Sequence, residues 1–136
     1  MSPELMYALL QMGHGDEIVF GDANFPAESI GERVIRADGD TVTALLESIM
    51  PFFPLDNYVE ENVILMSVVP GKGEAPEVWE SYKQIIIKND SEKAFVDFAF
   101  IDRQSFYDRA KKAFAVVATG EKAKYANIIL KLGVAE

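Results

Sequence analysis

Apolar and polar residues along the chain follow two periodicities, one typical of strands and one typical of helices. Short apolar runs predict strands at residues 17–21, 32–37, 62–69, 93–101, 114–120 and 127–133. Apolar positions spaced three or four residues apart predict helices at residues 2–12, 41–50, 75–87 and 103–113. Because strands and helices alternate, we expect one α/β domain over residues 1–136, with a mixed, mostly parallel β-sheet and helices packed on its faces.

Two of the predicted helices carry clear start signals. Ser2 is placed to accept a hydrogen bond from the first turn of the first helix, and Pro3 suits the first helical position. For the second helix, Asp38 and Asp40 are the expected caps. Its predicted buried face is formed by Val42, Leu45, Leu46 and Ile49.

Charge and composition narrow the classes of partner. The chain has 13 basic and 22 acidic side chains, which gives a net charge of -9. This balance argues against nucleic acid as a partner, because phosphates attract basic surfaces, and it disfavours docking on anionic membranes. The absence of cysteine rules out disulfides, cysteine-based zinc sites and thiol nucleophiles. No signal peptide or membrane-length apolar run is visible, so we expect a cytoplasmic protein.

The first candidate for chemistry is His14, which is the one histidine of the chain and lies between two glycines. Histidine titrates near neutral pH and can therefore give or accept a proton. Asp16 and Asp22 follow it closely and flank a predicted strand. One histidine with scattered carboxylates is poor ligand spacing for zinc, so no metal is expected. The alternative interpretation is an ordinary surface histidine in a loop.

The second candidate is Arg103, which follows the strand predicted at residues 93–101. An arginine at a helix start is unfavourable to the helix dipole, and its guanidinium could instead donate hydrogen bonds to a substrate's hydroxyls or ring oxygen. Tyr107 and Arg109 lie one or two turns later. The alternative is a solvated charge paired with Asp102 or Asp108.

The third candidate is the polar segment at residues 119–127, between the last two predicted strands. Its Tyr125 and Asn127 supply neutral donors and acceptors of the kind that orient a polyhydroxylated ligand. The alternative is a polar hairpin turn. The chain contains no glycine-rich phosphate-binding motif and no nucleophile elbow, so we expect no nucleotide cofactor.

Three stretches of the chain resemble the D-ribose pyranase / L-fucose mutarotase family. They read SPELMYALLQMGHGDEIVFGDANFPA, VIRADG and RQSFYDRAKKAFAVVATGEKAKYANIILKLGV. The match runs essentially from end to end, and the last stretch is closer to the fucose branch. The resemblance implies an isomerase of carbohydrate metabolism that interconverts ring forms of a free monosaccharide, here L-fucose, without any cofactor.

The resemblance also assigns roles to individual residues. His14 matches the family's proton donor, which would act as a general acid in ring opening. The positions that match sugar-binding residues are Asp22, Arg103, Tyr125, Ala126 and Asn127. Arg103 favours the fucose branch, because the ribose branch typically has histidine at this position. Asp16 lies in the same motif and is expected to play only a structural or orienting role.

Two alternatives to fucose mutarotation stay open: a D-ribose pyranase, which exchanges pyranose and furanose rings, and a non-catalytic monosaccharide-binding protein. The resemblance further implies a homo-oligomer, up to a ring-shaped decamer, with sites near subunit boundaries. Family members usually carry several residues before the SPEL motif, which begins here at Ser2. We therefore expect the packing at the N-terminus to differ from theirs, with no effect on the matched positions.

Overall fold

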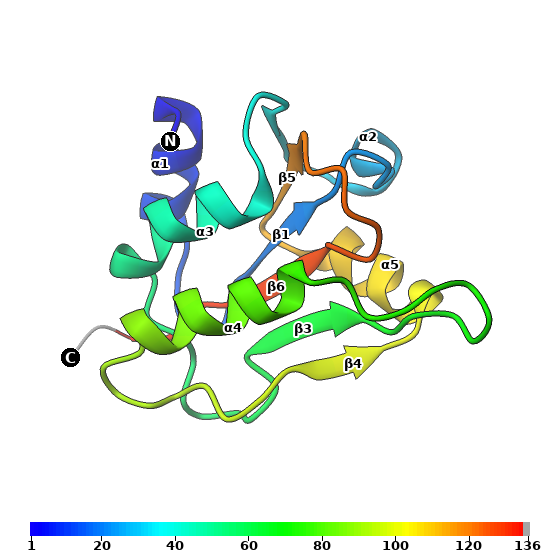
Figure 1. Cartoon of the computed structure of the whole chain (residues 1–136). Helices are drawn as coiled ribbons and strands as arrows, with labels where there is room; N and C mark the ends of the chain where they lie inside the picture. Colours follow the sequence, from blue (N-terminus) through cyan, green and yellow to red (C-terminus); the bar gives the residue numbers. More distant parts are fainter. Residues whose placement is uncertain (135–136) are drawn as a thin grey trace.

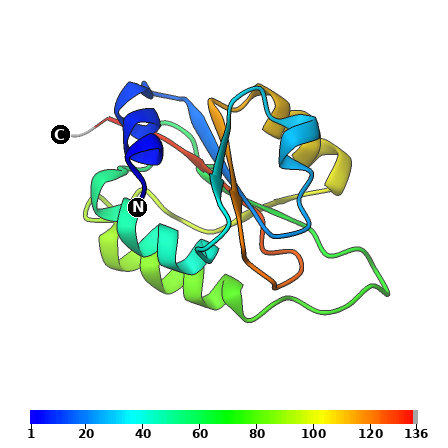
Figure 2. The same cartoon turned by 90° about the horizontal axis from the view of Figure 1, so that it is seen from above.

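The central feature of the computed structural model, which describes residues 1–134, is a six-stranded sheet between two layers of helices (Figure 1, Figure 2). The strands are β1 (Glu17–Gly21), β2 (Val34–Ala37), β3 (Val63–Met66), β4 (Ala99–Ile101), β5 (Ala115–Thr119) and β6 (Ile128–Lys131), in the spatial order β2-β5-β1-β6-β3-β4. β6 pairs antiparallel with β1 and β3, and the other strand pairs are parallel. The predicted mixed, mostly parallel sheet is confirmed.

The helices cover both faces of this sheet, as Figure 2 shows from above. They are α1 (Pro3–Gln11), α2 (Ala27–Ile30), α3 (Val42–Ile49), α4 (Val78–Asn89) and α5 (Arg103–Lys112), with a 3-10 turn η1 (Met50–Phe52) after α3. α1, α3 and α4 pack on one face, and α2 and α5 pack on the other. α2 is a single turn in a segment that the sequence predicted to be a loop. No helix within residues 1–134 is long and apolar enough to span a membrane.

The core is divided between the two faces by the alternation of side chains along each strand. In β1, Ile18 and Phe20 pack against the layer of α1, α3 and α4, whereas Val19 packs against α2 and α5. All four residues of the predicted apolar face of α3 are at most 2% exposed. The predicted buried face of α3 is therefore confirmed.

Helix starts agree with the prediction at α1 and differ from it at α3. The Ser2 side chain accepts a hydrogen bond from the Leu5 amide at 3.1 Å, as expected of an N-cap. At α3 the cap is Thr41, whose hydroxyl accepts from the Ala44 amide, so the prediction of Asp38 or Asp40 was wrong. The reason is positional, because the helix begins at Val42 and a cap must immediately precede it.

The strand predicted at residues 93–101 is much shorter in the structure, where β4 covers Ala99–Ile101. Asp90 at the end of α4 accepts hydrogen bonds from the amides of Ala94 and Phe95, at 2.9 and 2.7 Å. The Ala94 carbonyl accepts from the side chain of Asn62. These main-chain groups are bonded to side chains instead of a neighbouring strand, so the ladder begins only later.

The last two strands do not form a hairpin, because β1 lies between β5 and β6. The segment that joins them therefore crosses over the end of β1. Its ends are tied there: the Thr119 hydroxyl donates to the Gly21 carbonyl at 2.8 Å, and the Asn127 amide oxygen accepts from the Asp22 amide at 2.7 Å. The alternative interpretation of this segment as a hairpin turn was wrong, and Thr119 and Asn127 at its two ends face the end of β1.

Candidate active site

A pocket of about 510 Å³ opens at one edge of the sheet. The carboxyl ends of the parallel strands meet at this edge, and β6 begins there because it runs in the opposite direction. The pocket is lined by Asp22, Asn24, Phe25, Met66, Val69, Lys72, Arg103, Tyr107, Lys124, Tyr125 and Asn127. Its volume is typical of small-molecule sites, which span roughly 300–1,000 Å³. The prediction of a site at strand ends thus corresponds to a real hollow.

Asp22 lies in the wall of this pocket, directly after β1, and only 7% of its surface is exposed. Burial raises the pKa of its carboxyl group, and nearby Glu121 raises it further, while hydrogen bonds from peptide groups such as that of Asn24 oppose the shift. The main chain of Asp22 is held by Asn127, which is itself buried. Asp22 therefore presents a carboxylate of fixed position whose charge is costly to bury.

Arg103 reaches the pocket from the first position of α5. Its guanidinium carbon lies 5.5 Å from the centre of the Tyr107 ring, one turn later on the same helix. Asp102 caps α5 through the Ser105 amide at 2.7 Å, and Asp108 accepts from a glutamine. Within residues 1–134 Arg103 forms no ion pair, so its five N–H donors are directed to the pocket and to solvent.

Tyr125 and Asn127 form another wall of the pocket, just before β6, whereas Ala126 between them is not part of the lining. Tyr125 has a φ of 57°, and its hydroxyl accepts a hydrogen bond from the Val69 amide at 3.3 Å. The Ala126 side chain is fully buried in the core, so this residue offers the region its main chain and not its side chain. The hydroxyl of Tyr125 and the amide of Asn127 remain the polar groups of this wall.

His14 lies at the other edge of the sheet, before β1 begins. Its Nε2 atom is 3.1 Å from Oδ1 of Asp56, and its ring centre is 5.0 Å from that of Tyr58. Burial alone would raise the pKa of Asp56, but hydrogen bonds from the Tyr58 amide and from His14 outweigh it, so the pKa lies below the usual range. An ionised carboxylate at this distance orients the imidazole and leaves Nδ1 directed away from Asp56.

The two glycines that flank His14, Gly13 and Gly15, form a turn held by main-chain hydrogen bonds. Gly15 has a φ of 89°, in the region that favours glycine, and its amide donates to the Leu132 carbonyl at 2.8 Å. The Gly13 amide donates to the Asp16 carboxylate at 2.7 Å, so Asp16 closes the turn. This hydrogen bond is the structural role expected for Asp16. In this turn, 43% of the His14 side chain is exposed.

Within one chain, His14 and Asp22 do not line the same pocket. β1 separates them, and it spans five residues, which at about 3.3 Å per residue amounts to about 16 Å. His14 is not part of the pocket lining. His14 and Asp22, to which the resemblance assigns roles on the same sugar, are therefore not brought together within the single chain.

The residues that contact His14, and the apolar residues that line the pocket, were not predicted from the sequence. Asp56 and Tyr58 were not singled out, although the LDNY stretch is typical of an Asx turn, in which Asp56 accepts from the Tyr58 amide at 3.0 Å. Nothing in the sequence indicates that this turn meets His14, which is 42 positions away. Phe25, Met66 and Val69 supply the apolar part of the pocket lining, and none of them was predicted as a site residue.

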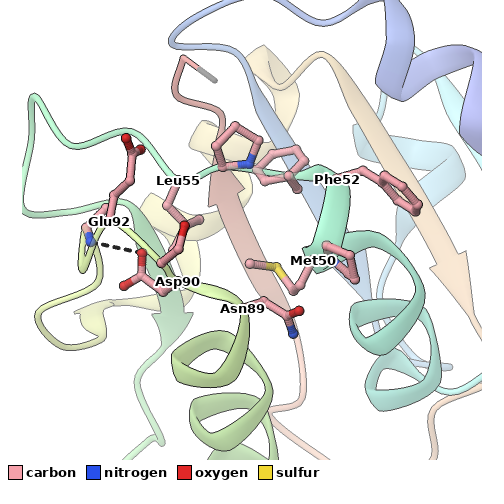
Figure 3. A pocket seen from close by; sticks show the side chains of 11 residues that line it. Met50, Phe52, Leu55, Asn89, Asp90 and Glu92 are labelled. Carbon is pink, nitrogen blue, oxygen red and sulfur yellow. Dashed lines mark hydrogen bonds between the residues drawn. The ribbon is translucent and has the colours of Figure 1, made fainter. Parts of the chain in front are cut away.

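Two further hollows contain none of the predicted sugar-binding residues. One, of about 270 Å³, lies between η1 and the end of α4, where Phe52 and Asn89 are found on opposite sides (Figure 3). The other, of about 730 Å³, lies near Gly15. It contains Arg109, which the sequence grouped with Arg103 but which bonds to the Glu17 carboxylate, with its closest contact at 2.6 Å. Arg109 therefore stabilises the edge of the sheet at which His14 lies, and it does not line the strand-end pocket that contains Asp22.

Comparison with known proteins gives matches over nearly the whole chain. The model of the RbsD / FucU transport protein family matches residues 1–135. A human fucose mutarotase is 51% identical over 140 residues, which cover 98% of this chain and 89% of the relative. A fucose mutarotase of Mus musculus is 50% identical over 139 residues, with the same coverage of both chains.

The fold is also similar to that of a solved structure. The crystal structure of a fucose mutarotase from Streptococcus pneumoniae, in complex with L-fucose, superimposes with a TM-score of 0.93 at 45% sequence identity. The match covers 99% of this chain and 94% of that one. The chain thus shares its fold with a protein whose crystal structure contains L-fucose.

Proposed function

The chain belongs to the RbsD / FucU transport protein family. We propose that, within this family, it is an isomerase that interconverts the α and β anomers of free L-fucose. The observation that carries the proposal is the pocket at the strand ends. It combines the buried carboxylate of Asp22, the guanidinium of Arg103 and the Tyr125 and Asn127 side chains. These groups can donate to and accept from several hydroxyls of a neutral sugar at once. The cytoplasmic location stays a prediction from the sequence.

Anomer exchange requires two proton movements. Protonation of the ring oxygen and removal of the anomeric hydroxyl proton break the bond between the anomeric carbon and the ring oxygen, which leaves the open-chain aldehyde. Rotation about the adjacent carbon–carbon bond and reclosure on the other face return both protons. No electrons leave the sugar, so a near-neutral acid and base suffice, and we assign the acid to His14. Asp56 would orient the imidazole and balance the charge that it carries when protonated.

The distance between His14 and the pocket supports a site shared between two copies of this chain. A sugar held by Asp22 lies about one strand length from the imidazole of the same chain, too far for direct proton transfer. Tyr58, whose ring centre lies 5.0 Å from that of His14, is 74% exposed and presents an aromatic surface that a neighbouring subunit would cover. We therefore extend the proposal to a homo-oligomer in which one subunit's His14 meets the next subunit's pocket.

The activity is tested by saturation-transfer NMR on the anomeric protons of L-fucose, with D-ribose measured in parallel. We expect the protein to accelerate L-fucose anomer exchange well above the uncatalysed rate, and to act on L-fucose faster than on D-ribose. Equal or faster exchange of D-ribose would instead identify a ribose pyranase. Binding of L-fucose without any acceleration would identify a non-catalytic sugar-binding protein.

The raised pKa of Asp22 predicts a specific pH dependence of sugar binding. The ionised carboxylate accepts hydrogen bonds from sugar hydroxyls, and this form is lost as the pH falls through the raised pKa. Affinity for L-fucose should therefore decrease at mildly acidic pH, above the pH at which an ordinary aspartate titrates. Titrations of sugar binding from about pH 7 to pH 4 measure this decrease directly.

The matched variant is Asp22→Asn, which keeps the shape and removes the titration. We expect its affinity at neutral pH to be lower by about tenfold, because a hydrogen bond to a charged group is lost, and to vary little with pH. Asp38→Asn is the control, since Asp38 is an exposed aspartate paired with Arg36. An unchanged acidic decrease in Asp22→Asn would contradict the assignment.

A further inference from the structure

Two aromatic side chains of α4 bind the main chain of the wall that carries Tyr125 and Asn127. The Trp79 indole N–H donates to the Tyr125 carbonyl at 2.7 Å, and the Tyr82 hydroxyl donates to the next carbonyl, that of Ala126, at 2.8 Å. Trp79 and Tyr82 are three residues apart, so they lie on the same face of the helix. α4 therefore holds the carbonyl groups of two consecutive residues, shortly before β6 begins at Ile128.

The hydrogen bond from Trp79 is made to Tyr125, whose backbone has a positive φ angle. Tyr125 has a φ of 57°, a left-handed conformation that residues other than glycine rarely adopt and that persists only where surrounding contacts fix it. Tyr82 is fully buried, and burial raises the pKa of its hydroxyl, which therefore stays a donor. Trp79 is half-buried at the first turn of α4 and contacts Phe100, with ring centres 5.3 Å apart. Of the two donors, Trp79 is the one that bonds directly to Tyr125, which lines the pocket.

Tyr125 also connects the two ends of the segment between β3 and α4. Val69, near the start of that segment, lines the pocket and donates its amide to the Tyr125 hydroxyl at 3.3 Å. Trp79, just after its end, holds the Tyr125 carbonyl. One residue is thus fixed at its side chain by one end of the segment and at its main chain by the other.

We propose that Trp79 is a positioning residue for sugar binding: its indole N–H sets the main chain of Tyr125 and thereby the place at which the Tyr125 hydroxyl and the Asn127 amide meet the sugar. The proposal rests on the proposed function, because it concerns the same pocket. It assigns Trp79 to affinity and not to proton transfer, since its indole bonds to the pocket wall, whereas His14 bonds to Asp56 at the other edge of the sheet.

The test is Trp79→Phe, which keeps an aromatic ring and removes the N–H donor. We expect KM and Kd for L-fucose to rise about three- to tenfold, as for the loss of one hydrogen bond, while kcat stays within about twofold of the wild type. The matched control is Phe100→Leu, which alters the ring packed against Trp79 and leaves its hydrogen bond in place. This variant should bind and convert L-fucose like the wild type.

A second measurement uses the fact that Trp79 is the one tryptophan of the chain. Its indole N–H resonance gives a single NMR signal, which we expect to shift when L-fucose is added to the wild-type protein. An unchanged Kd in folded Trp79→Phe, or a loss confined to kcat, would overturn the proposal. Because Kd and the indole shift do not depend on turnover, they test it even if the wild type binds L-fucose without exchanging its anomers, the outcome that would overturn only the proposed function.

Discussion

Replacing His14 with glutamine is expected to lower the rate of L-fucose anomer exchange by about 10²- to 10⁴-fold, the usual contribution of a general acid or base. Glutamine keeps a side-chain N–H that can still donate to Asp56, but it cannot exchange protons near neutral pH. The change should leave the fold intact, because 43% of the His14 side chain is exposed and its contacts are confined to the loop around Asp56 and Tyr58. Saturation-transfer NMR measures the rate, and thermal unfolding checks the fold.

The control for this variant is Gln11→Ala, which changes an exposed polar residue near the end of α1, three positions before His14. It should retain the wild-type rate. Binding of L-fucose to His14→Gln should persist, because the pocket lining is unchanged. Wild-type exchange in a folded His14→Gln protein would remove His14 from the mechanism and leave the proton donor to be sought among the pocket residues.

Mixing two inactive variants is expected to restore activity if the site is shared between subunits. One variant is His14→Gln, and the other is Asp22→Ala/Arg103→Ala, which loses two polar groups of the pocket. When the two are refolded together in equal amounts, about one quarter of the sites in a homo-oligomer should combine an intact His14 with an intact pocket. The rate per site should therefore rise from background to about a quarter of the wild-type value.

Two controls make this result specific. Each variant refolded alone should stay at its own background rate, and the two mixed without unfolding should gain activity only as fast as subunits exchange. A mixture that remains inactive, although it contains mixed oligomers, would mean that each chain completes its own site. His14 would then have to approach Asp22 by a rearrangement of β1 that breaks its pairing with β5 and β6.

Local sequence determined most of the elements and the division of the core. The apolar spacing of α3, the Ser2 cap of α1 and the alternation in β1 depend on residues close together in the chain. The candidates that follow β1 and β4 or precede β6 do lie together, because the carboxyl ends of parallel strands meet at one edge of a sheet and the antiparallel β6 begins there. Asp22, Arg103, Tyr125 and Asn127 were all named in this way, and all of them line the pocket.

Tertiary structure alone decided how these elements and groups combine. β4 is short because Asp90 and Asn62 take the hydrogen bonds of the preceding main chain, and β5 and β6 are separated because β1 is inserted between them. The pairing of His14 with Asp56 joins positions 42 residues apart, which no local pattern encodes. A local motif showed His14 and Asp22 close together in sequence, but an extended strand between them carries the two side chains to opposite edges of the sheet.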